Sequence, residues 1–132
     1  MRVISFIAAL AVASSVHAEK ADETAAKELI TQAMDYLNIA YACQDAIGVS
    51  YFDLARERTV QAFVFLGAIG SPEAIRNSQV SAAKIVDESI EIIRRKSTKF
   101  SKAAAGKCLE ELQAAQTRMD MSLLKFKIAA RR

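Results

Sequence analysis

Apolar residues recur at steps of three and four positions along most of this chain. That spacing predicts helices with one buried face, because three to four residues make one helical turn. Gly48 and the segment Gly70-Ser71-Pro72 interrupt the pattern, as expected where glycine ends one helix and proline opens the next. Four helices are therefore predicted, over about residues 22–47, 50–69, 72–96 and 101–130.

The boundary between the last two predicted helices is the least marked. Residues 97–101 read Ser-Thr-Lys-Phe-Ser and contain neither glycine nor proline. Serine and threonine are weak helix formers, so we expect a loop here. The alternative is one long helix over residues 72–131 whose apolar stripe dimerises.

Composition favours an all-α fold. The chain of 132 residues has only four glycines and one proline, too few for an all-β protein full of tight turns. Four amphipathic helices with short connections favour an up-down four-helix bundle, in which the first and fourth helices are neighbours.

The two cysteines bear on this topology. Cys43 lies about four residues before the end of the first predicted helix, roughly 6 Å along its axis. Cys108 lies about seven residues into the fourth helix, roughly 10 Å from the same end. These similar heights predict a disulfide between Cys43 and Cys108, which joins the first and fourth helices. Two buried free thiols or an intermolecular bridge are the alternatives.

The first eighteen residues have the pattern of a secretory signal peptide. Arg2 gives a positive start, residues 3–13 are almost wholly apolar, and Val16 and Ala18 occupy the positions that a signal peptidase reads. The apolar run is about a dozen residues, short of the roughly 20 that span a membrane. We therefore expect cleavage after Ala18 and a single helical domain over residues 19–132, with no transmembrane segment. The mature protein would be secreted, or periplasmic in a bacterium, where a disulfide is permitted.

The predicted mature chain has few residues suited to catalysis or metal binding. His17 is the only histidine and lies in the predicted signal peptide, so no histidine is left as a base or metal ligand. Two cysteines are too few for a thiolate zinc site. The adjacent acids Glu110 and Glu111 point to different parts of a helix surface. We expect no catalytic residue, no metal and no cofactor, and predict that the chain is not an enzyme.

Charge is unevenly distributed along the chain. Residues 19–75 hold nine acidic and four basic side chains, whereas residues 76–132 hold six acidic and thirteen basic ones. No acid occurs between Glu91 and Glu110, so the bases of this interval predict a positive patch near the third loop. A solvated helix end that offsets the helix dipole is the alternative. The bases are Arg94, Arg95, Lys96, Lys99, Lys102 and Lys107.

These features favour a secreted, non-enzymatic binding protein whose basic end meets an anionic partner, which is a protein, a glycan or a lipid surface. Nucleic acid is disfavoured, because the protein is predicted to be exported and only Phe100 lies among the bases.

Two other functions are alternatives. The first is a carrier of a small apolar ligand or lipid, and the second is a membrane-active or antimicrobial protein. The second rests on residues 123–132, which are basic and apolar, although their phase continues the core stripe through Met119 and Phe126. A carrier would need a cavity between the helices, and plain core packing is the competing interpretation of its apolar side chains. The cavity candidates are Phe63, Phe65, Leu66, Tyr41 and Phe100.

Overall fold

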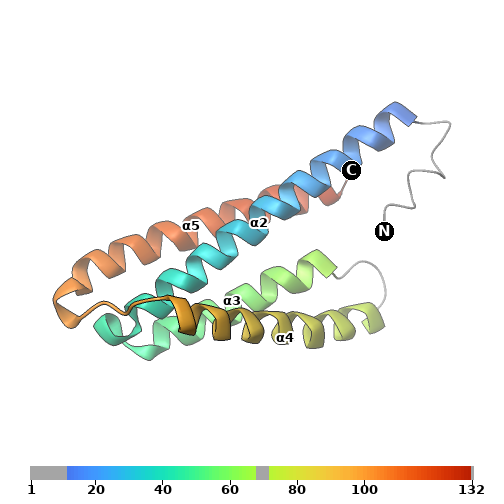
Figure 1. Cartoon of the computed structure of the whole chain (residues 1–132). Coiled ribbons are helices and arrows are strands. Elements are labelled where there is room, and N and C mark those ends of the chain that lie inside the picture. The colour runs from blue at the N-terminus through green and yellow to red at the C-terminus, as the bar shows by residue number, and fades with distance from the viewer. Residues whose placement is uncertain (1–11, 68–71, 132) are drawn as a thin grey trace.

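The computed structural model describes the backbone of residues 12–67 and 72–131, and the side chains of residues 23–67 and 79–131. Four α-helices follow one another up and down, and a short 3₁₀ helix, η1, precedes the last of them (Figure 1). The predicted all-α, four-helix up-down bundle is confirmed. The elements are α2 (Val12–Ile47), α3 (Val49–Gly67), α4 (Pro72–Lys96), η1 (Lys102–Ala104) and α5 (Ala105–Ala130).

Two helix starts differ from those predicted. Helix α2 begins at Val12 instead of near Asp22, so Asp22 lies inside the helix. Neither glycine nor proline occurs between Val12 and Ile47, so nothing in this segment stops the helix from extending. Helix α3 begins at Val49, so Ser50 is already helical. Residues 1–11, most of the predicted signal peptide, lie outside the described residues.

A single residue connects α2 to α3. Gly48 has a φ of +107°, a conformation that side chains disfavour, and its N–H donates to the carbonyl of Gln44 at 2.9 Å. The glycine therefore ends α2 as predicted and allows the chain to reverse direction at once.

Residues 97–101 form the predicted loop, and the alternative of one long helix is wrong. The Ser97 hydroxyl donates to Asn38 Oδ1 at 2.8 Å, and the Phe100 N–H donates to the Ala42 carbonyl at 2.7 Å. The Ser97 N–H keeps its helical bond to the Ile93 carbonyl at 2.8 Å, whereas the bond from the Phe100 N–H to α2 replaces the intrahelical one that continuing α4 would have given it. A segment of weak helix formers gives up its helical bonds at little cost.

The predicted disulfide between Cys43 and Cys108 is confirmed. It joins α2 to α5 with a Cα–Cα distance of 5.7 Å, and both cysteines are buried. Helix α2 also packs more extensively against α5 than against any other element. The first and last helices are therefore neighbours, as the up-down topology requires.

All four helices contribute to one hydrophobic core. Its largest fully buried side chains include Tyr36, Leu29, Leu37 and Met119, and alanines at many other positions let the helix backbones approach closely. Ile30 lies three and seven positions before the buried Ala33 and Leu37, which is the spacing of a core face, yet it is exposed. The buried alanines are Ala25, Ala33, Ala40, Ala55, Ala62, Ala82, Ala115 and Ala129.

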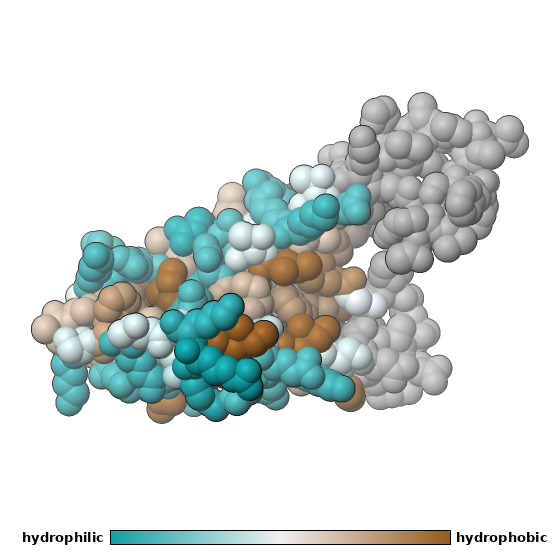
Figure 2. Space-filling view, in the orientation of Figure 1, coloured by the Kyte–Doolittle hydropathy of each residue, from teal (hydrophilic) through white to brown (hydrophobic). Residues whose placement is uncertain are grey.

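Helices α2 and α3 form the centre of the bundle, with α5 and α4 on opposite sides. From α3, Arg56 reaches Asp87 of α4, while Arg58 reaches Asp120 of α5. Residues two apart in a helix point in nearly opposite directions, so α4 and α5 flank α3 on different sides. Figure 1 shows the same order, and Figure 2 shows apolar side chains among hydrophilic ones on the face that carries α4.

The register of α2 against α5 places residues 12–18, the described part of the predicted signal peptide, outside the paired region. Besides the disulfide, Arg118 donates to Gln32 Oε1 at 3.3 Å and Ser122 donates to Glu28 Oε2 at 3.2 Å. Continued along the two antiparallel helices, this register sets the end of α5 beside about residue 20 of α2. Figure 1 shows the first turns of α2 extending past the end of α5. Cleavage after Ala18 would therefore leave the paired length of α2 intact.

We expect Thr59→Val to raise the free energy of unfolding by about 1 kcal/mol. Thr59 is fully buried, and its Oγ1 has no hydrogen-bond partner among the described residues, so valine removes a desolvated polar atom at nearly constant shape. Urea unfolding measures the effect, with the exposed Thr117→Val as the control. A lower stability of Thr59→Val would show that the hydroxyl has a partner after all.

Replacing both Cys43 and Cys108 with serine is expected to cost about 4 kcal/mol of unfolding free energy, since the bridge closes a long loop in the unfolded chain. The two cysteines are 65 residues apart. Parallel denaturant titrations of the oxidised parent, the reduced parent and the double variant measure the cost. A reduced parent as stable as the oxidised one would contradict this expectation.

Candidate functional site

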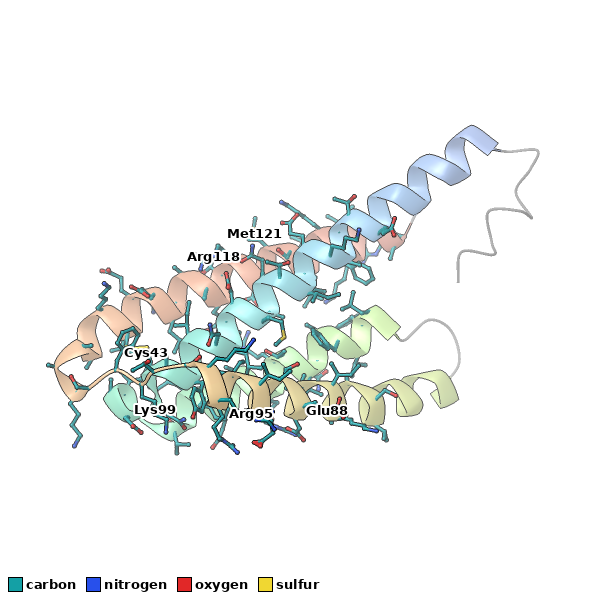
Figure 3. The ribbon with its side chains drawn as sticks, viewed as in Figure 1. Cys43, Glu88, Arg95, Lys99, Arg118 and Met121 are labelled. Carbon is teal, nitrogen blue, oxygen red and sulfur yellow. A yellow bond between two sulfur atoms is a disulfide. The ribbon has the colours of Figure 1, made fainter. Side chains whose placement is uncertain are left out.

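The predicted basic residues lie in the half of the bundle that holds the disulfide. Arg94, Arg95 and Lys96 form the last turn of α4, and the following bases lie on the loop, in η1 and in the first turn of α5. Figure 3 shows Lys99 close to Cys43, and it shows Arg95 on α4, farther from Cys43 than Lys99 is. We call this set the basic end: Arg94, Arg95, Lys96, Lys99, Lys102 and Lys107.

Three bases of the basic end form ion pairs. Arg94 pairs with Glu91 one turn earlier in α4. The Lys99 ammonium lies 3.8 Å from Asp45 Oδ1 of α2, and the Lys107 ammonium lies 3.7 Å from Glu111 Oε2. These pairs lie at the surface, where each contributes little to stability and leaves the cation accessible to other anions.

Lys99 is the base of the basic end whose side chain is held by contacts with two other residues. Its ammonium lies 5.2 Å from the centre of the Tyr41 ring, in addition to its pairing with Asp45. Tyr41 is buried and packs edge-on against Phe52 of α3, with ring centres 5.9 Å apart. A cation over an aromatic face is attracted by the ring's quadrupole, so the lysine is positioned by both contacts.

The other three bases, Arg95, Lys96 and Lys102, are exposed and form no ion pair within the described residues. Three acids pair with three of the six bases, so the basic end retains a surplus of positive charge. Exposed apolar side chains lie at the same end of the bundle, among them Val49 and Phe100. The surface is thus a mixture of cations and apolar groups.

The five cavity candidates fall into two groups. Tyr41 lies at the disulfide end, as does the exposed Phe100, whereas Phe63, Phe65 and Leu66 lie near the far end of α3. From Phe52, which packs on Tyr41, to Phe63 is about 17 Å along the helix. Phe63 and Leu66 pack against the core, and Phe65 is exposed. Ala68 and Ile69, which continue this apolar segment in the sequence, lie outside the described residues.

Phe100 borders a small cavity beside the disulfide. Its volume is about 10 Å³, and it is also lined by Ala104, Lys107, Cys108 and Glu111. A space of that size holds about one water molecule. It therefore offers no room for a lipid chain.

The C-terminal half of α5 is apolar on two faces. Met119, Phe126 and Ala129 are buried, which agrees with a core stripe in this segment. Met121, Leu124 and Ile128 form a second stripe that is exposed. The sequence analysis missed this stripe, because it assigned the apolar residues of the tail to one face. Leu124 and Ile128 follow Met121 by three and seven positions, and this second helical spacing could have revealed the stripe.

Helices α3 and α5 run parallel and are bridged by side chains. The Arg58 guanidinium lies 3.5 Å from Asp120 Oδ1, and seven residues later the Lys127 ammonium lies 4.2 Å from the centre of the Phe65 ring. Tyr36 of α2 lies near the pair of Arg58 and Asp120. Burial raises the pKa of Tyr36, the nearby Arg58 opposes that rise, and Asp120 adds to it. The tyrosine is therefore neutral at physiological pH.

Arg56 makes the best-aligned ion pair in the described residues, and it joins α3 to α4. Its Nε donates to Asp87 Oδ1 at 2.8 Å and its Nη2 donates to Asp87 Oδ2 at 3.0 Å. The hydrogen bonds from Arg56 lower the pKa of Asp87, and burial only weakly opposes them. A two-point contact of this kind fixes the orientation of both side chains.

Metal-binding and membrane-spanning features are absent from the described residues. No group of three or more histidine, cysteine, aspartate or glutamate side chains is placed to hold a metal ion there. Across the same part of the chain, no helix combines the length and apolar character needed to cross a membrane.

Comparison of the chain with protein-family models, with curated proteins and with solved structures gives no match.

We expect Asp87→Asn to cost about 0.5 kcal/mol at pH 7, a small amount because both partners are substantially exposed, at 38% and 56%. The folded-state pKa of Asp87 is lowered, so the stabilisation is complete above the ordinary aspartate pKa, near 3.9, and is lost as the pH falls through the lowered pKa. The stability difference between parent and variant should therefore vanish in acid.

Unfolding by urea at a series of pH values measures this difference. Glu88→Gln, on the same helix and with no ion pair among the described residues, is the matched control. A cost for Asp87→Asn that persists unchanged in acid would show that the pair's charge is not its source.

Proposed function

We propose that this chain is a secreted, non-enzymatic helical binding protein that uses its basic end to engage an anionic partner or surface. The observation that carries the proposal is the run of six bases from the last turn of α4 to the first turn of α5, in the disulfide half of the bundle, three of them without an ion pair in the described part of the chain. Such a concentration attracts an anion from a distance and strengthens its binding on contact.

The rigid attachment of the basic end supports a binding role. The backbone of the loop is held to α2 by the hydrogen bond from Phe100 to Ala42, and the start of α5 is held to α2 by the disulfide at Cys108. Lys99 is in turn positioned over Tyr41. A partner that meets pre-positioned cations has less conformational entropy to remove than one that meets a flexible tail.

Export is the second part of the proposal, and two observations are compatible with it. The buried disulfide suits an oxidising compartment. The described part of the predicted signal peptide, residues 12–18, lies past the α2–α5 pairing, so cleavage after Ala18 takes none of the described residues from that contact. The carrier alternative has less support, because its five candidate residues fall into two groups and Phe100 is the one among them that borders the small cavity beside the disulfide.

The test uses the full chain, expressed in an exporting host and purified without reductant, on immobilised heparin as an anionic probe. The triple variant Arg95→Gln, Lys96→Gln, Lys102→Gln should bind roughly tenfold more weakly, because each exposed cation contributes about 0.5 kcal/mol to binding an anion. Binding of the parent should also weaken steeply as salt rises.

The control variant Lys27→Gln, Lys84→Gln, Arg118→Gln removes the same charge from exposed positions outside both proposed surfaces, and it should elute like the parent. Equal weakening by both variants would mean that net charge alone drives the binding, and no retention of the parent at low salt would refute the proposal. The intact mass of the purified protein reports whether cleavage follows Ala18.

A further inference from the structure

We propose that the outer face of the C-terminal half of α5 is a second binding surface, which docks on an anionic lipid bilayer. Met121, Leu124 and Ile128 follow one another at steps of three and four, so they form a single stripe along the helix. Their exposed fractions are 54%, 52% and 45%. Figure 3 shows Met121 on the edge of the α2–α5 pair that is remote from α4.

The stripe is an addition to the core face and not part of it. Met119 and Phe126, on the opposite face of the same helix, are buried against α2 and the rest of the core. Phe65 of α3 is also 42% exposed and lies under Lys127. The three side chains of the stripe present a patch on the order of a few hundred Å², the size of functional patches on monomeric proteins.

Charge around the stripe determines which occupant fits. No acidic residue occurs after Asp120, and bases border the stripe on both sides. By helical geometry, Lys127 and Arg131 lie on the α3 side of the stripe and Lys125 lies on the α2 side. Lys125 is held by Glu28, with its ammonium 3.2 Å from Oε2.

An apolar ridge between two rows of bases is the arrangement of a helix lying in a membrane interface. The apolar side chains enter the acyl boundary, and the lysine and arginine side chains extend sideways to the lipid phosphates. The ridge is a convex face of one helix, which a deformable bilayer surface can cover without a preformed groove. Because these lysine and arginine side chains attract anions, a membrane of neutral lipids is a poor match for the surface.

This surface is separate from the basic end. About 17 residues of α5 lie between Cys108 and Lys125, or roughly 25 Å of helix. The inference therefore does not depend on the proposed function, and an experiment can refute either proposal without refuting the other.

The test exploits the absence of tryptophan from the chain. The single variant Leu124→Trp places a fluorophore on the stripe, and Ile85→Trp places one on an exposed position of α4 as the matched control. With vesicles of phosphatidylcholine and phosphatidylglycerol, the Leu124→Trp emission should shift to shorter wavelength and be quenched by brominated lipid. The control emission should not change, and phosphatidylcholine vesicles alone should have little effect on either variant.

Vesicle co-sedimentation measures the contribution of the stripe. The variant Met121→Ser, Leu124→Ser, Ile128→Ser should bind anionic vesicles at least about tenfold more weakly, because it removes most of the apolar surface that enters the bilayer. Ile85→Ser, Ile92→Ser should bind like the parent, and circular dichroism verifies that both variants fold. The basic-end variant should retain the Leu124→Trp response even where it no longer binds heparin.

Three results would overturn the inference. The first is an unshifted Leu124→Trp emission on anionic vesicles, and the second is equal vesicle binding by the stripe variant and the parent. The third is a parent that sediments as a dimer and a stripe variant that sediments as a monomer, because a second copy of the chain would then cover the stripe.

Discussion

The pairing of α2 with α5 is the contact on which the rest of the molecule depends. Helix α5 lies along α2 from the disulfide at Cys108 to the contacts of Ser122 and Lys125 with Glu28. The covalent bond between Cys43 and Cys108 closes a loop that contains all of α3 and α4. These two helices are therefore confined close to α2 even before they pack, which reduces the entropy that folding must overcome. A core rich in alanine, with less apolar area per residue than leucine supplies, benefits from that reduction.

Electrostatic contacts adjust this arrangement without creating it. An acidic first half and a basic second half suggest general attraction between the halves, and Lys99 with Asp45 and Lys125 with Glu28 follow that rule. Arg56 with Asp87 and Arg58 with Asp120 reverse it, with the base in the acidic half. Local register therefore selects the partners, because an exposed pair contributes only when two side chains already lie side by side. The surplus charge left at the basic end is what remains available to a partner.

The two proposed surfaces use the same helix in different ways. At its start, α5 is joined to α2 by the disulfide and stands beside a loop whose bases are accessible to solvent. Near its end, α5 buries Met119 and Phe126 and leaves Met121, Leu124 and Ile128 on its outer face. Long-range electrostatic attraction at one end and apolar contact at the other would bring the protein to an anionic surface and then hold it there.

The sequence by itself determined the class of fold, the helix boundaries at Gly48 and Pro72, and the disulfide. Gly48, Pro72 and the heights of the two cysteines are local signals, and they were read correctly because helical geometry relates sequence distance directly to position. The bases of the basic end were also visible as a run, since they are close together along the chain.

Only the tertiary structure decided which apolar residues face solvent and which charges pair. Ile30 matches the core spacing yet is exposed, and Leu124 lies near core residues in sequence yet points outward, because burial depends on where the neighbouring helix lies. The five cavity candidates fall into two groups for the same reason: residue type does not determine which side chains packing brings together. Loop formation at residues 97–101 also rested on partners far away, Asn38 and Ala42, whose hydrogen bonds no local pattern reveals.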